Sequence, residues 1–253
     1  MVRSTGRSAD ADAGSRSGSG DLPVIVVTGM AFEARIARGE GVEVVYAARA
    51  DLLERALSAA VARGCSGIVS FGTAGGLAPD LKPGALVIAD AVVGPFGRVP
   101  TDAAWANRLA AALGTAPLAS RLRRGPMAAV AAPLMSADDK RALHRSTGAL
   151  AVDMESHLAG AVAAARGLPF AVCRAIVDPA WRTLPSAATA GLRDDGSTAL
   201  APILRELLRQ PSQIGALIQV AIDARAARVS LVQARHALGA ARALDMRVVD
   251  GAR

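Results

Sequence analysis

The chain has 253 residues, of which 52% are hydrophobic, 20% charged and 3% aromatic, and its formal net charge is +7. A chain of this size can bury a large core as one domain. Arginines carry most of the charge and are spread along the sequence, while aromatic side chains that could stack on bases are scarce, so we expect no nucleic-acid partner. The sequence shows neither the apolar segment of a secretory signal nor eighteen uninterrupted apolar residues, and we expect a cytoplasmic protein.

Cysteines and histidines are few. Cys65 and Cys173 are flanked by apolar sequence, which predicts buried thiols, and two cysteines are too few for a disulfide framework or a thiolate zinc site. His144 and His236 have no partners at metal-ligand spacing, and His157 is interpreted as a helix-face residue. We therefore expect no metal.

Strand and helix patterns alternate after a first segment, residues 1–20, that is rich in Ser, Gly and Ala and is predicted to be a disordered tail. The expected strands cover 22–30, 42–48, 65–72, 84–93 and 127–132, and the expected helices cover 51–64, which starts with Asp51 as its N-cap, 102–113 and 137–146. A strand, a helix and a strand follow over 148–180, with Gly167 and Pro169 ending that helix. This order predicts a single α/β domain, about 21–205, with a central, twisted, mixed but largely parallel sheet flanked by helices.

Polar residues follow four of the predicted strands. Gly29 leads to Glu33, a glycine cluster spans 72–76, Glu155 follows "VDM", and Asp178 ends "AVCRAIVD". Because the carboxyl ends of parallel strands gather at one edge of a sheet, the three carboxylates are expected to line a single cleft.

Each carboxylate also has a purely structural interpretation. Glu155 opens a helix, where an acidic side chain interacts favourably with the macrodipole. Asp178 precedes Pro179 and is equally typical of a turn. Glu33 is equally typical of a solvated residue in a first helical turn. These alternatives stay open at the level of the residues.

The glycine cluster "SFGTAGGL" has neither the dinucleotide-binding spacing nor the phosphate-loop lysine. Together with "TGMAFEA", "VDMES" and "CRAIVDPA", in this order and over about residues 24–185, it resembles the purine nucleoside phosphorylase and methylthioadenosine/S-adenosylhomocysteine nucleosidase superfamily. Within that superfamily, "VDPAWRTLPSAA" followed by "LRDDG" is most similar to the hopanoid-associated phosphorylases of bacteria, which are implicated in removing adenine from adenosylhopane.

The resemblance implies roles for particular residues. Asp178 matches the acid that binds the purine near N7 and helps to protonate it, and Glu155 matches the carboxylate that holds the ribose hydroxyls, with Met154 packing on the sugar. Glu33 matches the acid that activates water in the nucleosidases, and Thr73 stands where the family has a serine near the nucleophile. The glycine turn would present Thr73 and backbone N–H groups to water or phosphate.

The substrate would also be bordered by Gly29, Gly72 and Met135. In the segment that usually stacks an aromatic ring on the base, "AAPLMSADD" offers only Leu134 and Met135, so base recognition is expected to rest on apolar packing and main-chain contacts.

Two departures from the family pattern concern the nucleophile and the base. One branch of the phosphorylases has an arginine where this chain has Ser70, which weakens the case for phosphate, although Arg35 is a replacement to consider. Retention of Glu33 favours water. The nucleosidases have a serine where this chain has Val177.

A C-terminal extension, residues 206–253, follows the expected domain. On a helix, Arg225, Arg228, Arg235 and Arg242 fall on the same broad side as Ile214, Leu217, Ile218 and Val232. Such a helix either packs against the body or a partner subunit, or lies on an anionic membrane with its arginines reaching the headgroups. The second interpretation predicts peripheral contact with the inner membrane.

The sequence thus predicts an enzyme that cleaves the N-ribosidic bond of an adenine nucleoside, with adenosylhopane as first substrate, by water or phosphate. It needs no cofactor beyond inorganic phosphate as an alternative cosubstrate, and the family's habit predicts a homodimer. The alternatives are a nucleosidase or phosphorylase for soluble purine nucleosides such as methylthioadenosine, and a non-catalytic nucleoside-binding protein.

Overall fold

The computed structural model describes residues 22–115, 117–190, 193, 197 and 199–246. The tail predicted over 1–20, most of "LRDDG" and the last residues of the C-terminal extension lie outside the described part. The described elements are β1 (Val24–Thr28), α1 (Ala31–Ala37), β2 (Val42–Tyr46), α2 (Ala50–Ala62), β3 (Gly67–Gly76), β4 (Leu86–Gly94), β5 (Gly97–Pro100), α3 (Ala103–Leu113), β6 (Leu122–Ala129), α4 (Ala137–Thr147), β7 (Ala151–Asp153), α5 (Ser156–Ala165), β8 (Phe170–Asp178), α6 (Ser186–Ala190), α7 (Leu200–Arg209) and α8 (Ile214–Ala240).

One sheet organises the molecule. Its strands follow the order β2-β1-β3-β7-β6-β4-β5, and β8 pairs with both β3 and β4, so that β3, β7, β6, β4 and β8 form a closed ring. Five of the strand pairs are parallel, whereas β3–β7, β4–β5 and β4–β8 are antiparallel. The expected mixed and largely parallel sheet is confirmed.

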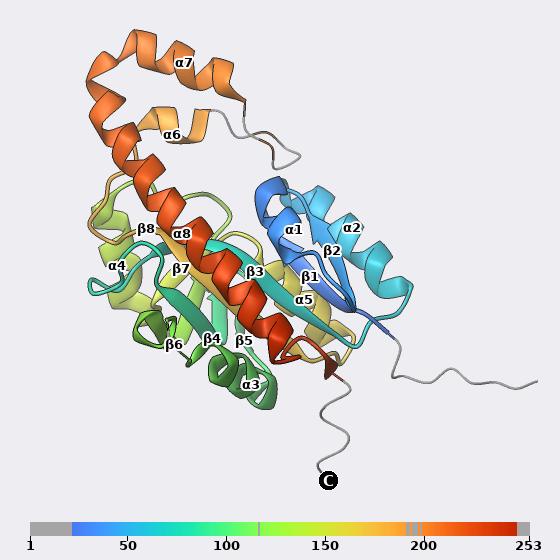
Figure 1. Cartoon of the computed structure of the whole chain (residues 1–253). Helices are drawn as coiled ribbons and strands as arrows, with labels where there is room; N and C mark the ends of the chain where they lie inside the picture. Colours follow the sequence, from blue (N-terminus) through green and yellow to red (C-terminus); the bar gives the residue numbers. More distant parts are fainter. Residues whose placement is uncertain (1–21, 116, 191–192, 194–196, 198, 247–253) are drawn as a thin grey trace, which may run out of the picture.

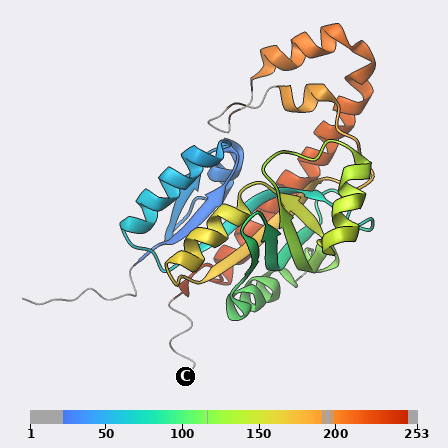
Figure 2. The same ribbon diagram turned by 180° about the vertical axis from the view of Figure 1, so that it is seen from behind.

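Helices cover both faces of this sheet. One apolar cluster joins α2 and α5 to the sheet through residues such as Leu53, Leu57 and Ala159. The second joins α3 and α8 to the opposite face through Trp105, Leu109 and Leu231. Figure 1 shows α8 crossing the front of the sheet, and Figure 2 shows α2 and α5 behind it. The strands are buried on both faces, which is why they appear as nearly continuous apolar runs.

Local signals agree with the structure in part. The helix expected over 102–113 is present, and Asp102 caps it, because its side chain accepts a hydrogen bond of 2.7 Å from the Trp105 N–H. Asp51 is not the N-cap of α2, which is Arg49; the Asp51 carboxylate instead accepts hydrogen bonds of 2.7 Å from Arg49 Nε and Arg55 Nη2. The prediction for Asp51 was wrong because flanking arginines offered stronger, charge-assisted partners than the helix terminus.

Two strands differ from the pattern. Strand β6 begins at Leu122, five residues before the expected start, and includes polar residues that face solvent, while the short hairpin strand β5 was not predicted. Both lie toward one end of the strand order, where a strand needs fewer buried side chains. Within the described residues, no helix is both long and apolar enough to cross a membrane.

Candidate active site

A cavity of about 270 Å³ opens where β1, β3, β7 and β8 end. Its lining is mostly apolar with a few carboxylates, and the volume is near the lower end for small-molecule sites. The lining residues are Gly29, Met30, Glu33, Ala48, Thr73, Ala74, Gly75, Val130, Pro133, Leu134, Lys140, Val152, Asp153, Met154, Glu155, Val177, Asp178 and Leu184. The expected convergence of strand ends has therefore placed Glu33, Glu155 and Asp178 around one cavity.

Glu33 is a buried carboxylate held by four donors. It lies in the first turn of α1, and one oxygen accepts hydrogen bonds from the backbone N–H groups of Gly29 (3.2 Å) and Met30 (3.0 Å). The other oxygen accepts from the Thr73 N–H and hydroxyl, both at 2.7 Å. Its exposure of 1% excludes the solvated alternative. The glycine turn of β3 thus holds the Glu33 carboxylate in place.

Arg174, in the middle of β8, connects the carboxylates from below. Its guanidinium is fully buried; Nε lies 2.8 Å from Asp153 Oδ2 and Nη2 lies 3.1 Å from Glu155 Oε2. Arg174 also donates a 2.6 Å hydrogen bond to Ser70 Oγ. A buried cation of this kind is stable only when paired, and here two carboxylates neutralise it.

Glu155 has an unusual acidity. Burial raises its pKa to about 7, the positive charge of Arg174 opposes that rise, and the negative charges of Asp153 and Glu33 add to it. The carboxyl therefore changes its charge near neutral pH, as expected for a group at a functional site. Glu155 is the N-cap residue of α5 but its side chain makes no capping hydrogen bond, so helix capping does not explain its position.

Two glycines provide the space for these side chains. A Cβ on Gly72 would lie 2.7 Å from Arg174 Nη1 and 2.8 Å from the Glu33 carboxyl group, and a Cβ on Gly29 would overlap Glu155 Oε1. Close approach of charged side chains to the backbone therefore requires glycine at both positions.

Asp178 and Lys140 form a buried pair at the other end of the cavity. The Lys140 ammonium donates to Asp178 Oδ2 and to the backbone carbonyl oxygens of Arg182 (2.8 Å) and Pro179 (3.3 Å). Asp178 Oδ1 is buried and has no hydrogen-bond partner. Burial raises the pKa of Asp178, and the hydrogen bond and charge of Lys140 oppose that rise.

Most of the residues singled out in the sequence lie at the cavity. Gly29, Glu33, Thr73, Met154, Glu155 and Asp178 line it, and Gly72 lies directly behind Glu33. Met135 does not line it; its backbone carbonyl accepts a 2.8 Å hydrogen bond from the Leu184 N–H, and Leu184 faces the cavity instead. The apolar surroundings expected for a base are present near Asp178 as Val130, Leu134, Val177 and Leu184.

Sequence reasoning missed Arg174 and Lys140. Arg174 interrupts an otherwise apolar strand, and such a residue in a buried strand must find a counter-charge. Lys140 is one of two lysines in the whole chain, on a helix whose neighbouring positions are polar, so its burial has no local signal. Within the described residues, no group of three or more His, Cys, Asp or Glu side chains could hold a metal ion.

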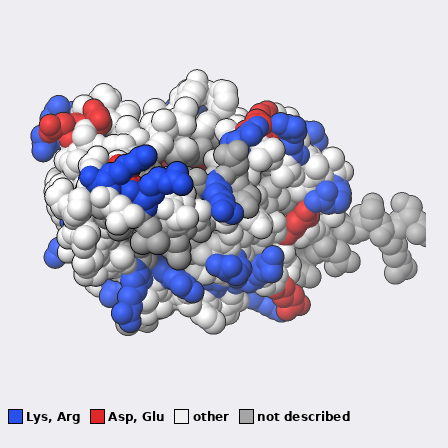
Figure 3. Space-filling model, turned by 90° about the horizontal axis from the view of Figure 1, so that it is seen from above, with Lys and Arg blue, Asp and Glu red and all other residues white. Residues whose placement is uncertain are grey.

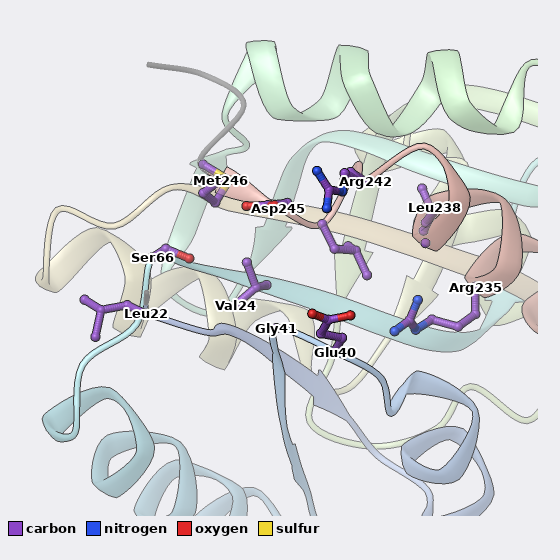
Figure 4. A pocket seen from close by; sticks show the side chains of 12 residues that line it. Leu22, Val24, Glu40, Gly41, Ser66, Arg235, Leu238, Arg242, Asp245 and Met246 are labelled. Atoms are coloured by element: carbon purple, nitrogen blue, oxygen red, sulfur yellow. The ribbon is translucent and has the colours of Figure 1, made fainter. Parts of the chain in front are cut away.

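A second cavity, of about 380 Å³, lies at the amino ends of the strands. Figure 4 shows Glu40 and Arg235 on its walls with Arg242 and Asp245 opposite, next to the beginning of β1. None of the residues predicted for function lines it. On the face seen in Figure 3, Lys and Arg side chains form separate groups between uncharged surface, not one continuous basic patch.

Carboxylates on different walls of an apolar cavity are the groups with which enzymes cleave glycosidic bonds. The fold and the site thus define an enzyme that breaks a bond to a sugar carbon. The sequence matches the family described as "Phosphorylase superfamily" over residues 19–209, and the chain belongs to this family. The family expected from the sequence motifs is confirmed, and with it the class of N-ribosyl hydrolases and phosphorylases.

Solved structures show the same fold at low identity. The 5'-methylthioadenosine/S-adenosylhomocysteine nucleosidase of Helicobacter pylori superposes with a TM-score of 0.61 at 17% identity, covering 88% of this chain and 98% of its own. A putative nucleosidase of the same name from Francisella philomiragia gives 0.59 at 16%, covering 87% and 98%. A futalosine hydrolase mutant of Helicobacter pylori gives 0.55 at 17%, covering 62% and 88%. No curated protein matches the sequence.

Proposed function

We propose that the protein hydrolyses the N-ribosidic bond of an adenine nucleoside. The observation that carries this proposal is the placement of Glu33, Glu155 and Asp178 around one cavity, with different partners holding each carboxylate. Cleavage of a ribosyl C–N bond passes through an oxocarbenium-like sugar, so the leaving base needs a proton and the nucleophile must approach the opposite face.

Each carboxylate takes one part of this reaction. Glu33 accepts a proton from water as the water attacks the anomeric carbon, while the bond to the base breaks and its electron pair goes to the base. Asp178, through the unpartnered Oδ1, donates a proton to the departing base. Ionised Glu155 accepts hydrogen bonds from the ribose hydroxyls and stabilises the positive charge that develops on the sugar.

Water is favoured over phosphate because the anion-binding groups are already in use. The N–H groups of Gly29, Met30 and Thr73 donate to Glu33, so the glycine turn does not offer them to a phosphate. Of the described residues that line the cavity, Lys140 is the one cation, and it is bound to Asp178. Arg35, the replacement suggested by the sequence, is exposed and borders a different hollow beside α8.

For the substrate we propose adenosylhopane, which the resemblance of "VDPAWRTLPSAA" supports. A cavity of about 270 Å³ suits a nucleoside, so a polycyclic substituent at the 5′ carbon would extend beyond it. The printed names of two similar structures, nucleosidases for 5'-methylthioadenosine and S-adenosylhomocysteine, support the soluble alternative.

The test measures adenine release by the purified protein from adenosylhopane and from methylthioadenosine, each with and without inorganic phosphate. We expect release that does not depend on phosphate and that is lost in Asp178→Asn, because the amide cannot deliver the proton. Phosphate-dependent release contradicts hydrolysis, and release only from methylthioadenosine contradicts the lipid substrate. No release from either, with nucleoside binding intact, favours the non-catalytic alternative.

We also propose that the outer face of α8 contacts an anionic membrane. This face exposes five apolar side chains, Ile214, Ile218, Ile222, Val229 and Val232. Arg225 and Arg228 are exposed on the same helix, and the only acid of α8, Asp223, is buried and paired with Arg182 at 2.9 Å. Apolar side chains flanked by cations fit a lipid surface with negative headgroups.

A second copy of the chain fits this face less well. In a twofold interface the same patch meets itself, which would bring Arg225 and Arg228 against their counterparts with no exposed acid on α8 to separate them. The homodimer expected from the family stays a prediction and is not assigned to this face. Arg235, which the helical projection grouped with the other arginines, turns inward and donates a 2.9 Å hydrogen bond to the Ala37 carbonyl.

Point substitutions test this contact better than truncation, because Leu231 and Leu238 of α8 belong to the core. Arg225→Glu/Arg228→Glu is compared with Arg145→Glu/Arg166→Glu, which makes the same charge change at exposed positions on α4 and after α5. We expect the first pair alone to lose sedimentation with phosphatidylglycerol vesicles. No binding by the wild-type protein, or equal loss in both pairs, contradicts the proposal.

A further inference from the structure

Lys140 is the one buried residue of α4, and it is a lysine. Its side chain is fully buried, although the residues next to it, Asp139 and Arg141, are exposed. Burying an ammonium group without partners is very unfavourable. Here each of its three N–H groups has an acceptor: Asp178 Oδ2, the Arg182 carbonyl and the Pro179 carbonyl. The ammonium group is therefore fixed in position.

This arrangement determines which atom of Asp178 faces the substrate. Oδ2 is bound to Lys140, whereas Oδ1 is buried without a partner on a residue that lines the cavity. A carboxyl group anchored through one oxygen presents the other in a fixed direction. The lysine thus orients the group that the proposed reaction requires beside the base.

The pair is anchored from a distant part of the chain. Arg182, whose carbonyl accepts from Lys140, forms an ion pair of 2.9 Å with Asp223 of α8. Asp178, Lys140, Arg182 and Asp223 therefore form one connected group, and they come from β8, α4, the segment after β8, and α8. The other titratable side chains that line the cavity are Glu33, Asp153 and Glu155.

We propose that Lys140 is a positioning residue for protonation of the leaving base, an inference that rests on the proposed function. When the C–N bond breaks, its electron pair goes to the base and the proton of Asp178 Oδ1 follows. Asp178 is left as a carboxylate beside the Lys140 ammonium, which keeps its own protons. Because that carboxylate forms next to a cation, protonated Asp178 is a stronger acid than it would be without the lysine.

Lys140→Met, which keeps the length but not the charge, is compared with Lys140→Arg, which keeps the charge. Two substrates are used: an adenine nucleoside and 4-nitrophenyl riboside, whose phenolate leaves without being protonated. For Lys140→Met we expect kcat on the nucleoside to fall about tenfold or more, with cleavage of the nitrophenyl riboside close to wild type. Lys140→Arg is expected to recover part of the nucleoside activity.

The pH profile gives a second readout. Activity on the nucleoside requires protonated Asp178, so it declines as pH rises through the pKa of that group. Removing the neighbouring cation raises the pKa of Asp178, and the alkaline limb of kcat/KM should move upward by about one pH unit or more in Lys140→Met. A role confined to folding would lower the melting temperature and both activities together and leave the limb in place.

Equal losses on the two substrates with an unmoved alkaline limb would overturn the inference. If Lys140→Met does not fold, Lys140→Gln, which keeps a donor for the Arg182 carbonyl, is put through the same comparisons. A wild-type protein that cleaves neither substrate contradicts the proposed function itself. A wild-type protein that cleaves both, with a Lys140→Gln variant that matches it in rate and profile, contradicts only the role of the lysine.

Discussion

Glu33→Gln separates the chemistry of the cavity from its structure. The wild-type carboxylate accepts four hydrogen bonds, two on each oxygen. In glutamine the amide oxygen can keep the Gly29 and Met30 N–H groups, and the NH₂ group can donate to the Thr73 hydroxyl, which rotates to accept. The Thr73 N–H alone loses its partner.

One unpartnered donor lowers the free energy of unfolding by about 1–3 kcal/mol, or the melting temperature by roughly 2–12 °C in a protein of this size. The loss of a base that activates water lowers kcat by about 10²–10⁴-fold. Calorimetry and adenine release measured on the same preparation distinguish the two effects. A Glu33→Gln protein that releases adenine within tenfold of the wild-type rate would refute the assignment of Glu33 as the base.

Two further predictions follow from the packing of the cavity. Gly72→Ala places a Cβ against Arg174 and Glu33, and we expect adenine release to fall about 10²-fold, whereas Gly215→Ala on α8, whose Cβ would meet nothing within 4 Å, leaves the rate unchanged; equal rates in the two variants contradict the role given to Gly72. Because the pKa of Glu155 is raised to about 7 in the folded protein, its ionisation costs stability as pH rises from its ordinary pKa to 7. Glu155→Gln should therefore gain about 3 kcal/mol relative to wild type between pH 4 and pH 8 in urea unfolding, and a constant difference between the variants contradicts the raised pKa.

The sequence was informative where local chemistry decides the outcome. Apolar runs that alternate with helical patterns predicted a largely parallel sheet, and the rule that strand ends meet at one edge correctly placed Glu33, Glu155 and Asp178 around one cavity. The helix over 102–113 was predictable for the same reason, since its cap, Asp102, has its partner only three residues away.

Contacts between distant parts of the chain were not accessible in this way. Lys140 and Asp178 are 38 residues apart, and Arg174 lies 104 residues from Ser70. Their partners depend on β8 pairing with both β3 and β4, which no periodicity encodes. The role of the glycine turn was likewise open, since the use of its N–H groups by Glu33 depends on how α1 packs beside β3.

The family match ends at Arg209, yet α8 begins five residues later and supplies part of the core. A recombinant fragment cut at the family boundary would lose Asp223 and, with it, the partner that fixes Arg182 beside the base end of the cavity. It would also uncover the apolar surface on which Ala227, Leu231 and Leu238 pack. Domain boundaries copied from homology would therefore yield an incomplete enzyme, and expression fragments should extend at least to residue 246.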